Sequence, residues 1–176
     1  MAPVTRLAAA LCLALAVPTA AQGPTLEYQV KAAYIYNFTK YVEWPSGALG
    51  TGPLTICIAG RNPFGVALDD IVRDERIDNR PVAVHVILEP DPACHVVFVP
   101  DGAATPAYLR AAQGRPVLTI GEMPGFIAMG GIVNFVRDRD NVRFEINPEA
   151  AERANLRISS RVMRLARPPD RGSLTP

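Results

Sequence analysis

Few residues of the chain are arranged for catalysis. A catalytic site of the common kinds needs an activated nucleophile, a pair of carboxylates in contrasting environments or a set of metal ligands. Ser159 and Ser160 lack the sharp glycine-flanked turn of a nucleophile elbow. Both histidines lie in or beside segments that we predict as strands, where a structural imidazole is expected. We therefore predict that the protein is not an enzyme and needs no cofactor.

A glycine-containing loop, Gly60 to Gly65, follows one predicted strand and precedes a predicted helix. Phosphate-binding loops share this order, but Val66 and Ala67 stand where such a loop needs lysine and a hydroxyl residue. Nucleotide hydrolysis is therefore disfavoured. The loop offers backbone amides and Arg61 as a generic anion site, and the alternative is an ordinary turn between a strand and a helix.

Polar side chains of a predicted hairpin could form part of a binding site. Pairing Arg137 with Val142 places Asn134 opposite Glu145, and strand parity puts Arg143 beside them on the same face. The alternative is that Glu145 only neutralises Arg143, in which case the cluster is structural.

A segment rich in arginine, from Arg157 to Arg167, follows this hairpin. If the segment is helical, the side chains of Arg157, Arg161 and Arg164 lie in a stripe along one face of the helix. Guanidinium groups bind carboxylates and phosphates through paired hydrogen bonds. We predict that the stripe and the hairpin residues form one site for a small anionic ligand or an acidic partner segment, and the alternative is a solvated face.

Aromatic residues are concentrated near the start of the chain. In the predicted helix Thr25–Trp44, apolar side chains cover a wide arc of the helix surface. Packing one face of the helix against one sheet would bury only part of that arc. Tyr36, Tyr41 and Trp44 are therefore predicted to contact a partner or a second copy in a dimer. The alternative is a helix wedged between the sheet and another helix.

The amino terminus has the three parts of a secretory signal: Arg6, the apolar stretch Leu7–Val17 and the small-residue sequence Pro18–Ala21. We predict cleavage before Gln22 and export to the periplasm. The mature chain then has 17 basic residues (18 minus Arg6) and 17 acidic residues, a formal charge of zero. Nonspecific nucleic-acid binding requires a positive surface, so that class is excluded.

Two cysteines, Cys57 and Cys94, follow the predicted signal. In an oxidising compartment the first hypothesis is a disulfide, which would join two strands of one sheet, and the alternative is two buried thiols. A zinc site is disfavoured because these thiols, His85 and His95 show none of the usual close ligand pairing.

Short apolar runs separated by proline and glycine predict the elements. Strands that are apolar throughout and alternate with helices are typical of a mainly parallel sheet buried on both faces. The predicted strands are Leu54–Ala59, Val82–Leu88, His95–Val99, Val117–Ile120 and the hairpin pair Ile132–Arg137 and Val142–Ile146. The predicted helices besides Thr25–Trp44 are Val66–Arg73, Thr105–Ala112, one capped by Asn147, and Ile158–Arg167.

These elements predict one α/β domain over residues 22–167. Its mainly parallel sheet is flanked by helices and ends in a C-terminal antiparallel hairpin. A glycine-rich loop, Gly121–Gly131, leads into that hairpin. The polar tail over residues 168–176 is predicted to be disordered.

Several blocks in one order resemble the YfiR-like family of exported bacterial proteins. The resemblance covers nearly all of Tyr28 to Arg167. The blocks are VKAAYIYNFTKYVEWP from Val30, ICIAG from Ile56, CHVVFV from Cys94, GGIVNF from Gly130, VRFEIN from Val142 and LRISSRVMRLA from Leu156.

The resemblance implies a non-enzymatic periplasmic protein that forms a homodimer, with Cys57 and Cys94 matching a family cysteine pair. It implies repression of an inner-membrane diguanylate cyclase through its periplasmic sensor domain, with release by redox or envelope stress. Cyclic-di-GMP and biofilm formation would be the outputs. Founding members carry a second cysteine pair, which is absent after Cys94. The alternative is a periplasmic module that binds a small ligand for another membrane receptor or sensor kinase.

Overall fold

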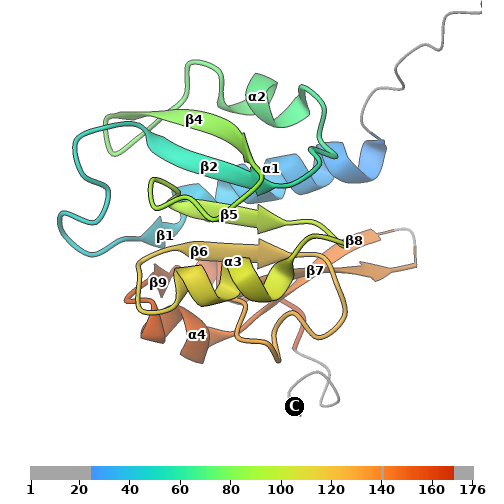
Figure 1. The fold of residues 1–176 in the computed structure, drawn as a ribbon. Coiled ribbons are helices and arrows are strands. Elements are labelled where there is room, and N and C mark those ends of the chain that lie inside the picture. The colour runs from blue at the N-terminus through green and yellow to red at the C-terminus, as the bar shows by residue number, and fades with distance from the viewer. Residues whose placement is uncertain (1–24, 140, 169–176) are drawn as a thin grey trace, which may run out of the picture.

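Within residues 25–139 and 141–168, which the computed structural model describes, a mixed sheet of seven strands forms the centre of the fold (Figure 1). The strand order is β3-β4-β2-β5-β6-β7-β8, with β3 and β8 antiparallel at the two edges. The predicted signal peptide and residues 169–176 of the predicted tail lie outside the described residues. The strands are β2 (Leu54–Ala59), β3 (Arg76–Ile77), β4 (Arg80–Ile87), β5 (Val96–Val99), β6 (Leu118–Gly121), β7 (Val133–Asp138) and β8 (Asn141–Ile146).

Helices cover both faces of this sheet. α1 (Leu26–Lys40) and α2 (Ala67–Val72) pack on one face, and α3 (Thr105–Ala112) packs on the other. Every residue of β2 and β5 is buried, which explains why these strands are apolar on both sides. The predicted fold class is confirmed. The short edge strand β3, which the sequence did not indicate, makes the sheet mixed at that end.

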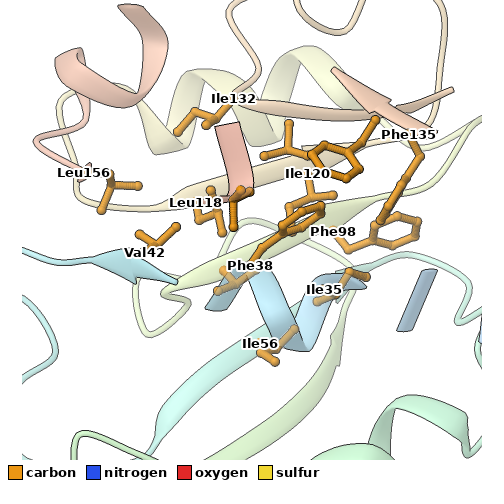
Figure 2. Close-up of a cluster of buried hydrophobic side chains, with 14 of the residues drawn as sticks. Ile35, Phe38, Val42, Ile56, Phe98, Leu118, Ile120, Ile132, Phe135 and Leu156 are labelled. Atoms are coloured by element: carbon orange, nitrogen blue, oxygen red, sulfur yellow. The ribbon is translucent and has the colours of Figure 1, made fainter. Parts of the chain in front are cut away.

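The core joins α1 to the C-terminal hairpin. Ile35 and Phe38 of α1 point toward Phe98 and Phe135 of the sheet (Figure 2). The Phe38 ring centroid lies 4.8 Å from that of Phe144, in an edge-to-face arrangement. Phe135 pairs with Phe144 in the register, as predicted.

The first helix is shorter than its apolar pattern indicates. α1 ends at Lys40 rather than at Trp44, and β1 (Val42–Glu43) then pairs with β9 (Arg157–Ile158) in a small separate sheet. The prediction of a helix to Trp44 was wrong because this long-range pairing outweighs the local helical period.

The second predicted helix of the C-terminal segment is also mostly absent. After α4 (Pro148–Arg153), whose N-cap Asn147 accepts a hydrogen bond from Ala150 N at 3.0 Å, the chain enters β9 and then a single helical turn, α5 (Ser160–Met163). Ser159 caps this turn, since its Oγ accepts from Arg161 N. The prediction of a helix over Ile158–Arg167 was wrong.

A disulfide joins Cys57 to Cys94, with the two Cα atoms 5.8 Å apart, and confirms the predicted pairing. The bond does not join two strands. Cys94 precedes β5, in residues 88–95, which carry the chain from the end of β4 past β2 to the start of β5. Parallel strands are usually connected through a helix. This connection contains no helix, so the disulfide holds it against β2.

A hydrogen bond to an imidazole supports the same end of that connection, because His95 directly follows Cys94. The backbone N–H of Thr55 in β2 donates to His95 Nδ1 at 3.0 Å, so this nitrogen carries no proton. Burial lowers the pKa of the half-buried His95, and the positive charges of Arg80 and Arg115 lower it further. The neutral imidazole is therefore part of the folded structure.

Removing the disulfide should destabilise the fold. Its sequence separation of 37 residues corresponds to about 4 kcal/mol of denatured-state entropy on the chain-entropy model. The variant with Cys57→Ala and Cys94→Ala should unfold at clearly lower urea concentration than the oxidised protein. Two free sulfhydryls in the denatured, unreduced protein, or an unchanged midpoint in the variant, would contradict this prediction.

Stability should also fall in mild acid through His95. Its folded-state pKa lies below the unfolded value of about 6.5, so the unfolded chain binds more protons in that window. The contribution is complete above about pH 6.5 and is lost as the pH falls through the folded pKa. His95→Asn keeps an acceptor near the Nδ1 position without this titration. Urea unfolding at pH 7.5 and 5.5 should show a smaller loss for His95→Asn, and equal losses would refute the assignment.

Candidate functional site

The carboxyl ends of three neighbouring strands, β2, β5 and β6, meet the first turns of α1 at one edge of the sheet (Figure 1). The chain leaves β2 for α2 on one face and leaves β5 for α3 on the opposite face. The crevice between β2 and β5 is therefore a topological switch point. Ligands of open α/β sheets bind in such crevices.

A buried lysine dominates this edge. Lys31 of α1 is 6% exposed, and its Nζ lies 2.6 Å from Glu27 Oε1 and 2.7 Å from Glu122 Oε2. Glu122 directly follows β6, and its Oε1 accepts a hydrogen bond from the Tyr28 hydroxyl at 3.1 Å. Arg137 of β7 forms a further ion pair with Glu27. The network thus ties α1 to the ends of β6 and β7.

The network shifts the titration of its members. Burial alone would raise the pKa of Glu27, but the hydrogen bonds and charges of Lys31 and Arg137 outweigh burial and lower it. Burial and the adjacent Glu122 carboxylate raise the pKa of Tyr28 to about 12. The phenol therefore remains a hydrogen-bond donor at physiological pH.

Two hollows flank the Tyr28–Glu122 contact. One, of about 340 Å³, lies at the switch point between the loops that follow β2 and β5, and Arg61 and Asp101 line it. The other, of about 260 Å³, lies against Phe135 and Val142 of the hairpin. Neither Arg61 nor the Asp101 carboxylate forms an ion pair with a described residue. They offer donors and an acceptor to a small polar ligand.

Metal chemistry finds no support in the described part of the chain, where no group of three or more His, Cys, Asp or Glu side chains could hold an ion. At the carboxyl edge, the Lys31 ammonium group occupies the space between the carboxylates of Glu27 and Glu122. The Tyr28 hydroxyl and the Lys31 ammonium group both donate to the Glu122 carboxylate.

The predicted hairpin register is confirmed. Asn134 lies opposite Glu145, and Val136 lies opposite Arg143. Asn134 and Glu145 are each only 3% exposed, whereas Arg143 is exposed. Asn134 Oδ1 has no hydrogen-bond partner among the described residues. The pair therefore lies inside the protein, and Arg143 alone of the three faces solvent.

The β1–β9 pairing brings together two sets of residues that the sequence suggested separately. Glu43 lies opposite Arg157, and the Arg161 guanidinium lies 5.7 Å from the Tyr41 ring centroid. We call Tyr41, Arg157 and Arg161 the aromatic–basic surface. Trp44, which follows β1, does not join it by any described contact, and its indole Nε1 is buried without a hydrogen-bond partner among the described residues. Both arginines are exposed, and both aromatic side chains are half-buried.

Two further predicted residues do not join this surface in the expected way. The Tyr36 hydroxyl donates to Glu75, on the stretch that leads into β3. Arg164 is exposed and donates to Ser160 Oγ at 3.4 Å. Because Arg157 lies in β9 and Arg161 in α5, the predicted single helical stripe of Arg157, Arg161 and Arg164 was wrong.

The sequence did not indicate the Lys31–Glu122 pair. Lys31 lies on a helix whose other features are aromatic, and Glu122 begins a loop that is distinguished by its glycines. Gly121, next to Glu122, is the one nearby residue type with a structural reason. A Cβ at this position would lie 2.4 Å from the Phe126 ring, so only glycine allows the loop to pack this closely.

Comparison with known families matches most of the chain. The family model described as YfiR/HmsC-like matches residues 28–167. No curated protein sequence matches the chain. Among the described residues, no helix is long and apolar enough to cross a membrane.

Breaking the buried ion pair should destabilise the protein strongly. Glu122→Gln leaves the Lys31 ammonium group with only Glu27, and such a change in a buried pair costs roughly 3 kcal/mol. The double variant Lys31→Met with Glu122→Leu should be less destabilised than Glu122→Gln alone.

Asp70→Asn is the matched control for this experiment. It removes a solvent-exposed pair with Arg73 and should change the free energy of unfolding by well under 1 kcal/mol. Equal effects of Glu122→Gln and Asp70→Asn in urea titrations would show that Lys31 does not depend on Glu122.

Proposed function

The chain belongs to the YfiR/HmsC-like family, and from this premise we propose that it represses an inner-membrane diguanylate cyclase by binding the periplasmic sensor domain of that enzyme. This family is periplasmic, regulatory and non-catalytic, and acts with membrane diguanylate cyclases. In this proposal the protein holds the cyclase inactive, and redox or envelope stress releases it. Cyclic-di-GMP and biofilm formation then rise.

The family match carries the proposal, and the aromatic–basic surface supports it. Tyrosine, tryptophan and arginine dominate the binding energy of protein interfaces. Here the Arg161 guanidinium lies 5.7 Å from the Tyr41 ring centroid, and Arg157 lies opposite Glu43 in the small sheet that follows α1. We propose that this surface contacts an acidic segment of the cyclase.

The exposure of the arginines fits a partner rather than a buried structural role. An exposed guanidinium gains little from an ion pair, because water screens it. If a partner shields Arg157 and Arg161 from water, each charge-assisted hydrogen bond contributes roughly 1.5 to 3 kcal/mol to the free energy of binding. We propose that Arg164, which is also exposed, extends the same basic surface. The exposed Arg143 lies opposite Val136, beside the hollow at the first turns of α1, and we propose it as a separate contact on the hairpin whose buried members are Asn134 and Glu145.

Deleting the gene in its host should raise cyclic-di-GMP and biofilm. Complementation with Arg157→Ala or Arg161→Ala should fail to restore repression, because each variant loses a contact made only in the complex. Both should melt near the normal temperature, since neither side chain is buried. Arg110→Ala is the matched control: Arg110 is exposed on α3, on the other face of the sheet, and should restore repression fully.

Full repression by both Arg157→Ala and Arg161→Ala would remove the aromatic–basic surface from the proposal. Copurification of the tagged protein from membranes tests the partner itself. Recovery of a receptor or kinase in place of a cyclase, or unchanged cyclic-di-GMP in the deletion strain, would overturn the proposed function.

A further inference from the structure

The hollow at the switch point carries one basic and one acidic side chain that lack a partner within the described residues. Arg61 lies in the loop after β2 and Asp101 in the loop after β5, and both line this space of about 340 Å³. Both side chains are exposed, and neither forms an ion pair with another described residue. The proposed cyclase contact, at the other end of α1, uses neither of them.

The sheet register places these two charges at equivalent positions. Ile58 of β2 lies opposite Phe98 of β5, so counting three residues onward from each reaches Arg61 and Asp101. The chain then continues to α2 on one face of the sheet and to α3 on the other (Figure 1). The two loops therefore form opposite walls of the hollow, and the guanidinium and carboxylate groups do not reach each other across it.

The floor of the hollow is a network whose charges are already paired. Glu122 Oε1 accepts from the Tyr28 hydroxyl at 3.1 Å and from the Asp101 backbone N–H at 3.4 Å. Its Oε2 accepts from Lys31 Nζ at 2.7 Å. Burial and the Glu122 carboxylate raise the pKa of Tyr28, and the positive charge of Arg61 opposes them, so the guanidinium lies near the phenol. A ligand in the hollow therefore meets the free charges of Arg61 and Asp101.

Local hydrogen bonds hold both walls in place. In the loop after β2, the Asn62 side chain donates to Gly65 O at 3.0 Å. In the loop after β5, Ala103 N donates to Pro100 O at 3.2 Å. A site that is ordered before the ligand arrives loses less conformational entropy on binding.

We propose that this hollow binds a short peptide, of dipeptide size, whose two ends are free. The Arg61 guanidinium donates paired hydrogen bonds to the terminal carboxylate, and the Asp101 carboxylate accepts from the terminal ammonium group. An anion alone would face the like charge of Asp101, and a cation alone would face that of Arg61. A single amino acid carries both charges on one carbon atom, whereas a dipeptide separates them by a peptide unit and spans the two walls.

The rest of the lining suits small side chains. It consists of alanine, glycine and proline residues on the two walls: Ala59, Gly60, Pro63, Pro100, Gly102 and Ala103. The methyl groups of Ala-Ala match this lining in size. The peptide site does not depend on the proposed function, because no cyclase contact enters the argument.

Blocked peptides test each charge by isothermal titration calorimetry at neutral pH. Ala-Ala should bind to the wild-type protein with one peptide per chain. N-acetyl-Ala-Ala lacks the ammonium group and Ala-Ala amide lacks the carboxylate. Each should bind about tenfold more weakly or worse, because a charge-assisted hydrogen bond contributes at least that factor. Free alanine, which cannot span the two walls, should also bind more weakly than Ala-Ala.

Variants of the two charges test which wall holds which end. Arg61→Gln should weaken binding of Ala-Ala about tenfold and remove its advantage over Ala-Ala amide. Asp101→Asn should remove its advantage over N-acetyl-Ala-Ala. Both variants should melt near the normal temperature, since both side chains are exposed. Arg110→Gln and Asp69→Asn are the matched controls: they remove exposed charges outside the hollow and should bind Ala-Ala as wild type does.

Four results would each overturn the peptide site. They are no binding of Ala-Ala at millimolar concentrations, an affinity for either blocked peptide equal to that for Ala-Ala, an affinity for alanine equal to that for Ala-Ala, and an Arg61→Gln or Asp101→Asn variant that binds Ala-Ala as tightly as wild type.

Discussion

The ammonium group of Lys31 must find anions inside the protein, since a buried charge without a partner costs several kcal/mol. Its partners come from α1 itself, through Glu27, and from the end of β6, through Glu122. This requirement sets the position of α1 along the sheet. With that position set, the ring of Phe38, two turns further along the helix, meets Phe144 of the hairpin at 4.8 Å. The aromatic core and the charge network therefore specify the same placement of one helix.

α1 connects the two ends of the molecule at which polar residues gather. Its first turns face the carboxyl edge, with the two hollows that flank Glu122. Its last residue is followed by Tyr41 and β1, which pairs with β9 and carries the aromatic–basic surface. A partner bound at that surface rests on an element whose other end is fixed by buried ion pairs. A rigid support of this kind lowers the entropy lost on binding.

Local patterns predicted the elements that depend on local rules. The apolar runs gave correct strands, and alternation about the 138–141 turn gave the correct pairing of Phe135 with Phe144. The failures involve contacts between distant residues. Val42 lies opposite Ile158 in a two-stranded sheet, and Lys31 forms an ion pair with Glu122. The periodic pattern of the sequence indicates neither contact. Ile158 and Val162 have helical spacing, but a strand residue and a one-turn helix produce it here. The sequence therefore named Tyr41, Arg157 and Arg161 but not the β1–β9 pairing that brings them together, and it indicated no part of the Lys31–Glu122 network.

The two edges of the central sheet differ in how much of their backbone is paired by other parts of the chain. At the β8 edge the chain returns after α5, and Arg167 N donates to Phe144 O at 2.8 Å, so part of that edge is occupied by the protein itself. The exposed Arg143 adds a charge there. At the opposite edge β3 covers only the start of β4, and the uncharged residues beyond it remain open. An open apolar edge exposes the folded protein to aggregation unless a strand covers it. The chain's own C-terminal residues thus pair with part of the β8 edge, whereas β3 is the only described strand on the outer side of β4 and pairs only with its first residues.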